Sequence, residues 1–166
     1  MRILKNSQGR KKKIITDEIT GFKLGGVALN KIKKVTFKKI LAKLSKLSSS
    51  FEENLLDSVN NYSLLIKDKK KLIGIPTDAL DRAKKESEIQ KKTGWCFTLD
   101  FPSYLPIMQY ADNRELRKEI YYAYATKASD LSDKNRDNTD NINRILSCKK
   151  ELSNLLGFPD YASMAL

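Results

Sequence analysis

The most reactive side chains of this sequence are two thiols, those of Cys96 and Cys148. A catalytic thiolate usually relies on a base such as histidine, and a structural zinc ion needs about four ligands, drawn mainly from cysteine and histidine. The 166 residues include two cysteines and no histidine. We therefore predict that both thiols are reduced and buried, with no catalytic or metal-binding role.

Carboxylates form the second group of candidates. Glu52 and Glu53 are adjacent, and Glu86 and Glu88 are two residues apart, so the members of each pair point away from each other on a helix. Asp100 stands just before a Phe-Pro step, where an aspartate more often caps a strand-to-helix turn than acts on a substrate. We predict solvated helix faces for the glutamates and a capping role for Asp100.

A tyrosine cluster, formed by Tyr121, Tyr122 and Tyr124, could stack on bases or line a peptide channel. The simpler interpretation places Tyr121 and Tyr124 in the core and Tyr122 on the surface. The pair Gly25-Gly26 indicates a helix-breaking turn and does not form a nucleotide-binding loop.

The net charge is +12, from 32 basic and 20 acidic residues. A basic face could bind the phosphates of a nucleic acid. Only seven of the basic residues are arginines, which make bidentate contacts that lysine cannot, and the lysines are spread along the sequence. A solvated lysine-rich surface is therefore predicted, and a basic helical nucleic-acid-binding domain stays open as an alternative.

No apolar run in the sequence approaches the length of a membrane span, and the basic N-terminal segment is not followed by the apolar stretch of a signal peptide. The expected compartment is the cytoplasm, and no membrane partner is expected.

Most of these residues are predicted to lie on helices or next to them. Apolar residues recur at steps of three and four from Phe37 through Leu47 to Tyr62, which predicts one long amphipathic helix. Further helices are predicted over residues 78–92 with Thr77 as N-cap, 103–110 with Pro106 in its first turn, 114–126 capped by Asp112 or Asn113, 142–156 ended by Gly157, and from Asp160 onward. A short β element is predicted near residues 64–75 and 94–99, and a polar loop without core residues over 129–141. The fold class is mainly α, with a basic tail or frayed helix at residues 1–13 and one incomplete helical domain at 14–166.

Three stretches of this sequence resemble a known family: TLDFPSYLPIMQYADN at 98–113, RELRKEIYYAYATKASD at 114–130 and ELSNLLGFPDYASMAL at 151–166. They are similar to the oligopeptidase A and thimet oligopeptidase family of zinc metallopeptidases, and the similarity extends over about residues 14–166. It implies the long-helix wall of a helical, clam-shaped peptidase fold with a short β ribbon. The family binds zinc through H-E-x-x-H, whose glutamate acts as base. None of those positions falls on this sequence, so no catalytic or metal residue is carried over, and substrate-binding residues stay unknown.

The expected function is therefore that of a truncated fragment from the non-catalytic N-terminal half of a zinc-dependent oligopeptidase, inactive alone. An alternative is one half of a split peptidase that needs a separate C-terminal chain. Zinc belongs to the intact family and not to this chain. Short peptides are expected as partners only when a catalytic half is joined, and self-association is expected through exposed apolar helix faces.

Overall fold

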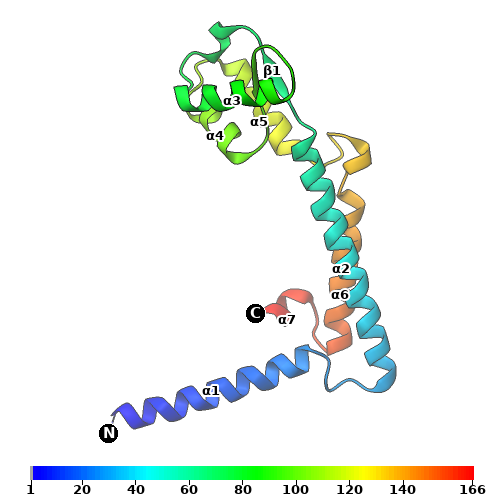
Figure 1. Cartoon of the computed structure of the whole chain (residues 1–166). Coiled ribbons are helices and arrows are strands. Elements are labelled where there is room, and N and C mark those ends of the chain that lie inside the picture. The colour runs from blue at the N-terminus through cyan, green and yellow to red at the C-terminus, as the bar shows by residue number, and fades with distance from the viewer. Residues whose placement is uncertain (1) are drawn as a thin grey trace. The chain divides into compact units, whose positions relative to one another are not determined.

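The computed structural model describes the backbone of residues 2–166 and the side chains of residues 9–166. The described part is mainly α with one short β ribbon, as predicted. In chain order the elements are α1 (Arg2–Leu24), α2 (Lys31–Asn60), β1 (Leu64–Ile66), the 3-10 helix η1 (Lys69–Leu72), α3 (Thr77–Ile89), β2 (Trp95–Phe97), α4 (Phe101–Tyr110), α5 (Arg114–Thr126), the 3-10 helix η2 (Lys134–Arg136), α6 (Thr139–Leu156) and α7 (Tyr161–Ala165) (Figure 1). Within this part of the chain, no helix has both the length and the apolar character of a membrane span.

The chain divides into two compact units. The first unit contains the residues up to Ser49 together with Asn141–Leu166, and the second contains Ser50–Asp140. The boundary expected at residue 13 falls inside α1, which runs without a break to Leu24. Met1 of the expected tail lies outside the described residues, and the single domain at 14–166 stays a prediction.

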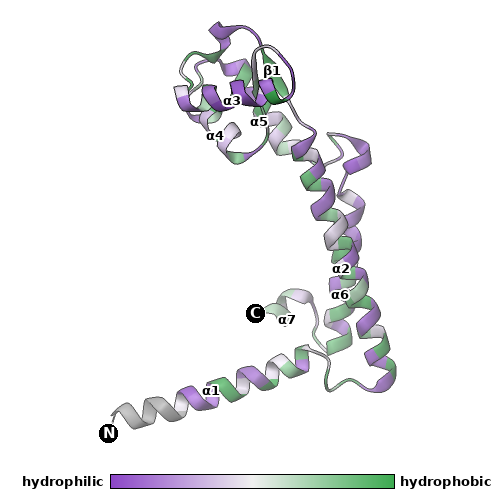
Figure 2. Ribbon diagram, in the orientation of Figure 1, coloured by the Kyte–Doolittle hydropathy of each residue, from purple (hydrophilic) through white to green (hydrophobic). Residues whose placement is uncertain are grey.

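The core of the first unit joins α2 to α6, which run side by side (Figure 1). Phe37, Ile40 and Leu47 of α2 meet Cys148 and Leu152 of α6 in one buried cluster. Their spacing of three, four and seven residues places them on one face of each helix. In Figure 2, apolar and polar residues accordingly alternate along both helices. The long amphipathic helix predicted from the apolar residues between Phe37 and Tyr62 is confirmed as α2, which ends at Asn60.

The end of α6 follows the predicted C-cap chemistry. Gly157 has a φ of +89°, and the N–H of Phe158 donates to the Ser153 carbonyl at 2.9 Å. This reversal ends the helix because only glycine takes the left-handed conformation without steric cost. Asp160 then starts α7, since its Oδ1 accepts a hydrogen bond of 2.7 Å from the Ser163 N–H. The same bond lowers the pKa of Asp160 below its ordinary value.

The second unit is built around a two-stranded antiparallel ribbon in which Leu65 of β1 is paired with Cys96 of β2. Helices α3, α4 and α5 cover the ribbon, and Phe97, Ile107 and Ile120 form the most deeply buried part of the core. The β element predicted near residues 64–75 is shorter than expected, and its partner is the strand predicted near residues 94–99. Only Leu64–Ile66 forms a strand, and the lysine-rich stretch after it turns into η1, whose first turn is closed by the Asp68 carboxylate accepting from the Lys70 N–H at 2.9 Å.

Helix α3 differs from its prediction at both ends. Pro76, not Thr77, is the N-cap residue, and its carbonyl accepts from the N–H groups of Ala79 and Leu80 at 3.1 Å. The helix ends at Ile89 instead of residue 92 because Lys91 takes a left-handed φ of 54°. That conformation reverses the chain and sends it back toward β2.

Pro106 lies in the middle of α4, and the prediction of a place in the first turn is wrong. The helix begins at Phe101, earlier than expected, which moves Pro106 to its sixth position. Proline cannot donate a hydrogen bond toward the carbonyl four residues earlier. In α4 that residue is Pro102, close to the helix start, so the lost bond falls at the end of the helical ladder and α4 continues to Tyr110.

Candidate binding grooves

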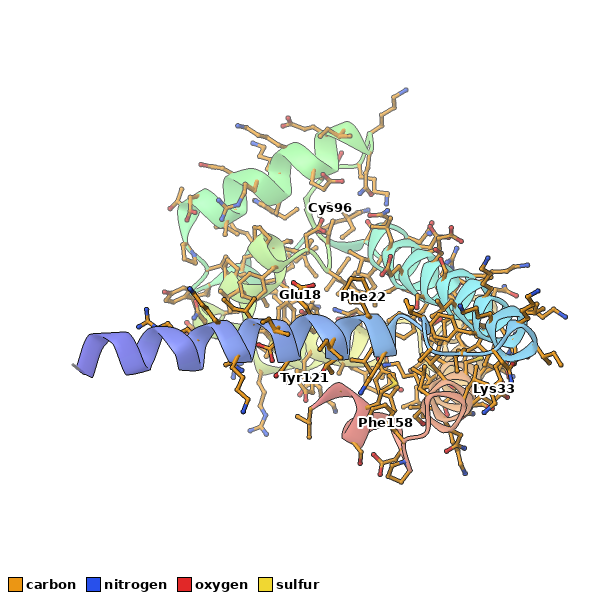
Figure 3. The ribbon with its side chains drawn as sticks, turned by 90° about the horizontal axis from the view of Figure 1, so that it is seen from below. Glu18, Phe22, Lys33, Cys96, Tyr121 and Phe158 are labelled. Carbon is orange, nitrogen blue, oxygen red and sulfur yellow. The ribbon has the colours of Figure 1, made fainter. Side chains whose placement is uncertain are left out.

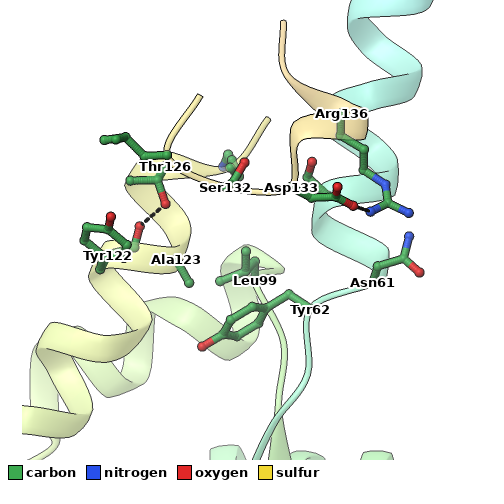
Figure 4. A pocket seen from close by; sticks show the side chains of 12 residues that line it. Asn61, Tyr62, Leu99, Tyr122, Ala123, Thr126, Ser132, Asp133 and Arg136 are labelled. Atoms are coloured by element: carbon green, nitrogen blue, oxygen red, sulfur yellow. Dashed lines mark hydrogen bonds and ion pairs between the residues drawn. The ribbon is translucent and has the colours of Figure 1, made fainter. Parts of the chain in front are cut away.

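A groove of about 410 Å³ opens in the second unit between the end of α2 and the end of α5 (Figure 4). We call it the α2–α5 groove. Its lining residues are Ser58, Asn61, Tyr62, Leu99, Tyr122, Ala123, Thr126, Lys127, Leu131, Ser132, Asp133 and Arg136. One wall is helical and the other is the loop that follows α5. The loop must therefore be held in place for the groove to exist.

Asn138 anchors that loop to α2. Its side chain is 2% exposed, its Nδ2 donates to the Phe51 carbonyl at 3.0 Å, and its Oδ1 accepts from the Asn54 side chain at 3.0 Å. A buried amide with both ends hydrogen-bonded fixes the position of the backbone that carries it. The prediction that residues 129–141 contain no core residue is therefore wrong.

Charged groups of opposite sign face each other on the loop side of the groove. Arg136 pairs with Asp133 three residues before it and lies 4.0 Å from the Asp57 carboxylate of α2. Asp133 also accepts a hydrogen bond from the Asn135 N–H at 3.0 Å. Lys127 stands on the opposite wall, with its Nζ 3.4 Å from the centre of the Tyr124 ring. These contacts hold both cations at the groove.

The floor of the groove is aromatic. Tyr62 is half-buried there, and desolvation, with a smaller contribution from the negative charge of Glu119, raises the pKa of Tyr62 to about 12. The phenol is therefore neutral at physiological pH and offers both a donor and an acceptor. On the opposite wall the Thr126 hydroxyl donates to the Tyr122 carbonyl at 2.8 Å (Figure 4). Chemically the groove can bind amide, hydroxyl and charged groups.

A second groove, of about 430 Å³, lies between α3, β2 and the start of α4. It brings together three residues that the sequence marked as candidates, Cys96, Asp100 and Glu86. Arg82 stands on the same lining and pairs with Asp78 at 3.0 Å. Glu86 accepts a hydrogen bond of 2.9 Å from the Gln90 side chain. The carboxylates thus have local partners.

Asp100 occupies the predicted cap position of α4, but its side chain does not cap the helix. Its backbone carbonyl accepts from the N–H groups of Ser103 and Tyr104, and its carboxylate accepts from the Thr98 hydroxyl at 3.1 Å. The Ser103 hydroxyl accepts from the Thr98 N–H at 3.0 Å. Together these bonds make a local turn, which agrees with a structural role for this segment.

Both thiols are free and buried, as predicted. Cys96 lies in the second unit, 2.9 Å from the Ser63 hydroxyl, and Cys148 lies in the α2–α6 core of the first unit. Among the described residues, no three cysteine or carboxylate side chains come close enough to hold a metal ion. Two cysteines without a histidine do not make up the ligand set of a zinc site.

The tyrosine prediction is partly wrong. Tyr124 is packed inward and stacks on Tyr104 with ring centres 4.0 Å apart, and Tyr122 is exposed, both as predicted. Tyr121 was expected in the core but is 55% exposed. Leu116 and Ile120 already fill the inner face of α5, and Tyr121 follows Ile120 by one residue, about 100° around the helix. Glu52, Glu53 and Glu88 are exposed, as expected for solvated faces.

Of the residues that line the α2–α5 groove, Tyr122 was a candidate from the sequence, as part of the tyrosine cluster, and the residues that hold its loop were not identified. Asp133 and Arg136 carry one local signal, an opposite-charge spacing of three residues. Asn138 carries none, because a buried asparagine and an exposed one look alike in a polar loop.

Comparison with known proteins places the chain beside one peptidase family. Residues 107–166 match the model of Peptidase family M3. The chain is 40% identical to Oligopeptidase A of Salmonella typhimurium over 157 residues. This match covers 93% of the chain and 23% of the Salmonella protein. The chain is 40% identical over 165 residues to the Probable cytosolic oligopeptidase A of Arabidopsis thaliana, with 94% and 23% covered. A Thimet-like oligopeptidase of Dictyostelium discoideum is 28% identical over 149 residues, covering 90% of this chain and 20% of that protein. The chain thus spans less than a quarter of the length of the relatives it matches.

Proposed function

Because the chain is a member of the oligopeptidase A and thimet oligopeptidase family, we propose that it forms a non-catalytic part of a zinc-dependent oligopeptidase. The observation that carries the proposal is 40% identity over 93% of the chain. The helical units would act as wall and support for a site whose reacting groups come from elsewhere.

The chemistry of zinc in this family is to polarise a peptide carbonyl and activate water. The sequence has no histidine, and its two cysteines lie in different units. These donors do not fit the metal, so no step of hydrolysis is derived for this chain. The zinc ligands and the base would come from residues outside the 166, in the same chain or in a separate one.

The α2–α5 groove is our candidate for contact with a peptide in the assembled enzyme. Peptides offer amide groups, side-chain charges and terminal charges. The groove offers Asn61, Ser132 and the phenol of Tyr62 for the amides and Lys127 and Arg136 for carboxylates. Small-molecule sites typically combine an apolar floor with a few placed polar groups of this kind.

The split arrangement is the second candidate, in which this chain assembles with a separate catalytic chain. A cytoplasmic location is part of the proposal and is supported by the name of the cytosolic Arabidopsis relative. Another Arabidopsis relative is named as organellar, so location is not common to all relatives.

Peptide hydrolysis by the purified chain tests the proposal. We expect no zinc-dependent cleavage of quenched fluorescent peptides of about five to twelve residues, while Salmonella oligopeptidase A cleaves them in parallel. Cleavage that elutes with the folded chain and disappears on chelation would overturn it. Restoration of activity on mixing with a catalytic segment of a relative would favour the split arrangement over a passive fragment.

Exposed apolar side chains support self-association of the isolated chain. Ile15, Ile19 and Phe22 recur at four and three residues on α1, and all three are exposed. Such a stripe favours burial against another surface. We expect sedimentation velocity to show concentration-dependent association that increases with salt, since salt screens the repulsion between basic molecules.

A further inference from the structure

The net charge of the protein is confined to one of its two units. Residues of the first unit carry 17 basic and 4 acidic side chains, whereas residues of the second carry 15 basic and 16 acidic. The first unit is thus at +13 and the second at −1. In sequence alone the lysines look evenly spread, because the second unit also has many, each balanced by a carboxylate.

Most of this excess lies along the first half of α2. Seven lysines fall between Lys31 and Lys46, and all are exposed. No acidic residue occurs between Ile19 and Phe51. None of the ion pairs found among the described residues includes a lysine of this stretch. The charge is therefore not neutralised locally.

Helical geometry places five of these lysines on the side of α2 that faces away from α6 and a sixth at its edge. Phe37, Ile40 and Leu47 point into the α2–α6 core. At 3.6 residues per turn, Lys33 lies one turn before Phe37 on that inner side, and Lys43, between Ile40 and Leu47 in spacing, lies at the edge of the buried face. The other five lie on the outer half. We define the lysine face as Lys31, Lys34, Lys38, Lys39, Lys43 and Lys46. Nitrogen-tipped side chains project outward from α2 in Figure 3.

We propose that the lysine face binds the phosphate backbone of a nucleic acid. From Lys31 to Lys46 the helix rises about 22 Å, a length over which one strand of a duplex presents about six phosphates. Six lysines along that length match the charge and the repeat of the backbone. Lysine acts as a point charge and makes no bidentate base contact, so binding is expected to be independent of base sequence.

The composition of the lysine face favours nucleic acid over a lipid surface. An interfacial helix buries an apolar face in the headgroup region, but the apolar face of α2 is already buried against α6. From Lys38 to Ser50 the outward positions between the lysines are Ala42, Ser45 and Ser49. Nearer the helix start Ile32 and Val35 are exposed, which is too few apolar side chains for a membrane-binding face. A protein partner is disfavoured for a related reason, because protein interfaces are anchored by aromatic residues and are poor in lysine.

The test compares two triple variants of the full chain that lose the same charge. The first is Lys38→Gln with Lys43→Gln and Lys46→Gln on the lysine face. The matched control is Lys69→Gln with Lys70→Gln and Lys71→Gln, three exposed lysines of η1 in the second unit. Binding to a labelled 25-base-pair DNA duplex, its RNA counterpart and a single strand is followed by anisotropy between 50 and 200 mM salt. Circular dichroism and thermal melting establish that each variant is folded.

We expect binding that weakens steeply with salt and does not depend on base sequence. The lysine-face variant should bind at least tenfold more weakly at 100 mM salt, and its slope of log K against log salt should fall by up to about 2.7, or about 0.9 for each lost phosphate contact. The η1 variant should change binding less than twofold. The DNA and RNA arms then show which backbone is preferred.

Equal losses in the two variants would overturn the proposal, because net charge alone would then explain binding. Absence of binding at 50 mM salt would also overturn it, as would binding to vesicles with anionic lipids but not to any nucleic acid. The proposal does not rest on the peptidase assignment, since none of these measurements involves peptide cleavage.

Discussion

At the scale of single residues, the side chains that could react chemically have structural roles, and other side chains shape the binding groove. Cys96, Cys148 and Asp100 have the functional groups of a reactive site, yet each lies in a packed or locally bonded position. The side chains that do shape a binding groove are Asn138, which fixes a loop, and Tyr62, which forms the floor.

Removing the Asn138 side chain should loosen the loop of the α2–α5 groove. Asn138→Ala leaves the Phe51 carbonyl and the Asn54 amide without their partner. We expect a loss of about 1–3 kcal/mol in the free energy of unfolding, measured by denaturant titration. Asn135→Ala, an exposed residue of the same loop, should change stability by less than about 0.5 kcal/mol. Equal effects of the two changes would show that Asn138 is not an anchor.

The ionisation of Tyr62 makes the stability of the folded chain depend on pH at high pH. Its folded pKa of about 12 lies above the ordinary value of 10, so the stabilisation of the neutral phenol is fully present below pH 10. It is lost as pH rises from 10 through 12. Phenolate absorbance of the folded chain should contain a step near pH 12 that belongs to Tyr62. Tyr62→Phe should remove that step, and Glu119→Gln should lower its midpoint. Absence of any step near pH 12, or a step that remains in Tyr62→Phe, would contradict the buried floor.

At the scale of elements, the helices follow their sequence patterns closely and the connections do not. Periodic apolar residues predict α2 and α6, and Asn113 caps α5 where expected, accepting from the Leu116 N–H at 3.0 Å. Both strands lie where a β element was predicted, but their pairing was not predicted because β2 lies about thirty residues farther along the chain than β1. The pattern of residues within one strand does not indicate which distant strand pairs with it.

Gly74 holds one of these connections close to another helix. It has a φ of +90°, and a Cβ there would stand 2.1 Å from the Tyr110 carbonyl at the end of α4. Gly74→Ala should therefore cost about 3 kcal/mol or more in stability. Gly21→Ala, in exposed α1 with nothing within 4 Å, should instead stabilise its helix by up to about 1 kcal/mol. Thermal unfolding with circular dichroism separates the two, and a harmless Gly74→Ala would contradict the close approach.

The candidate site was harder to predict than the fold for a physical reason. Helices depend on neighbours three and four residues apart, which a sequence displays directly. The α2–α5 groove depends on contacts such as Asn54 with Asn138, which are 84 residues apart. The distribution of charge was hard to predict for the same reason. The net charge of each unit can be counted only when the structure shows which residues form that unit.

At the scale of the whole molecule, the chain consists of a basic helical unit and a nearly neutral unit of helices and a β ribbon. Relatives match nearly all of this chain, yet the chain spans less than a quarter of their length. We expect the two units to serve as structural parts of a larger peptidase, with the catalytic groups supplied from outside these residues.

A graft tests this central claim most directly. The 157 matched residues of Salmonella oligopeptidase A would be replaced by the matched residues of this chain. The corresponding segment of the Arabidopsis relative, grafted in the same way, is the control. Peptide cleavage and zinc content would be measured for both. The account predicts a folded, zinc-containing chimera that cleaves peptides within about tenfold of the control graft. A folded chimera that binds zinc but does not cleave, beside an active control, would contradict it.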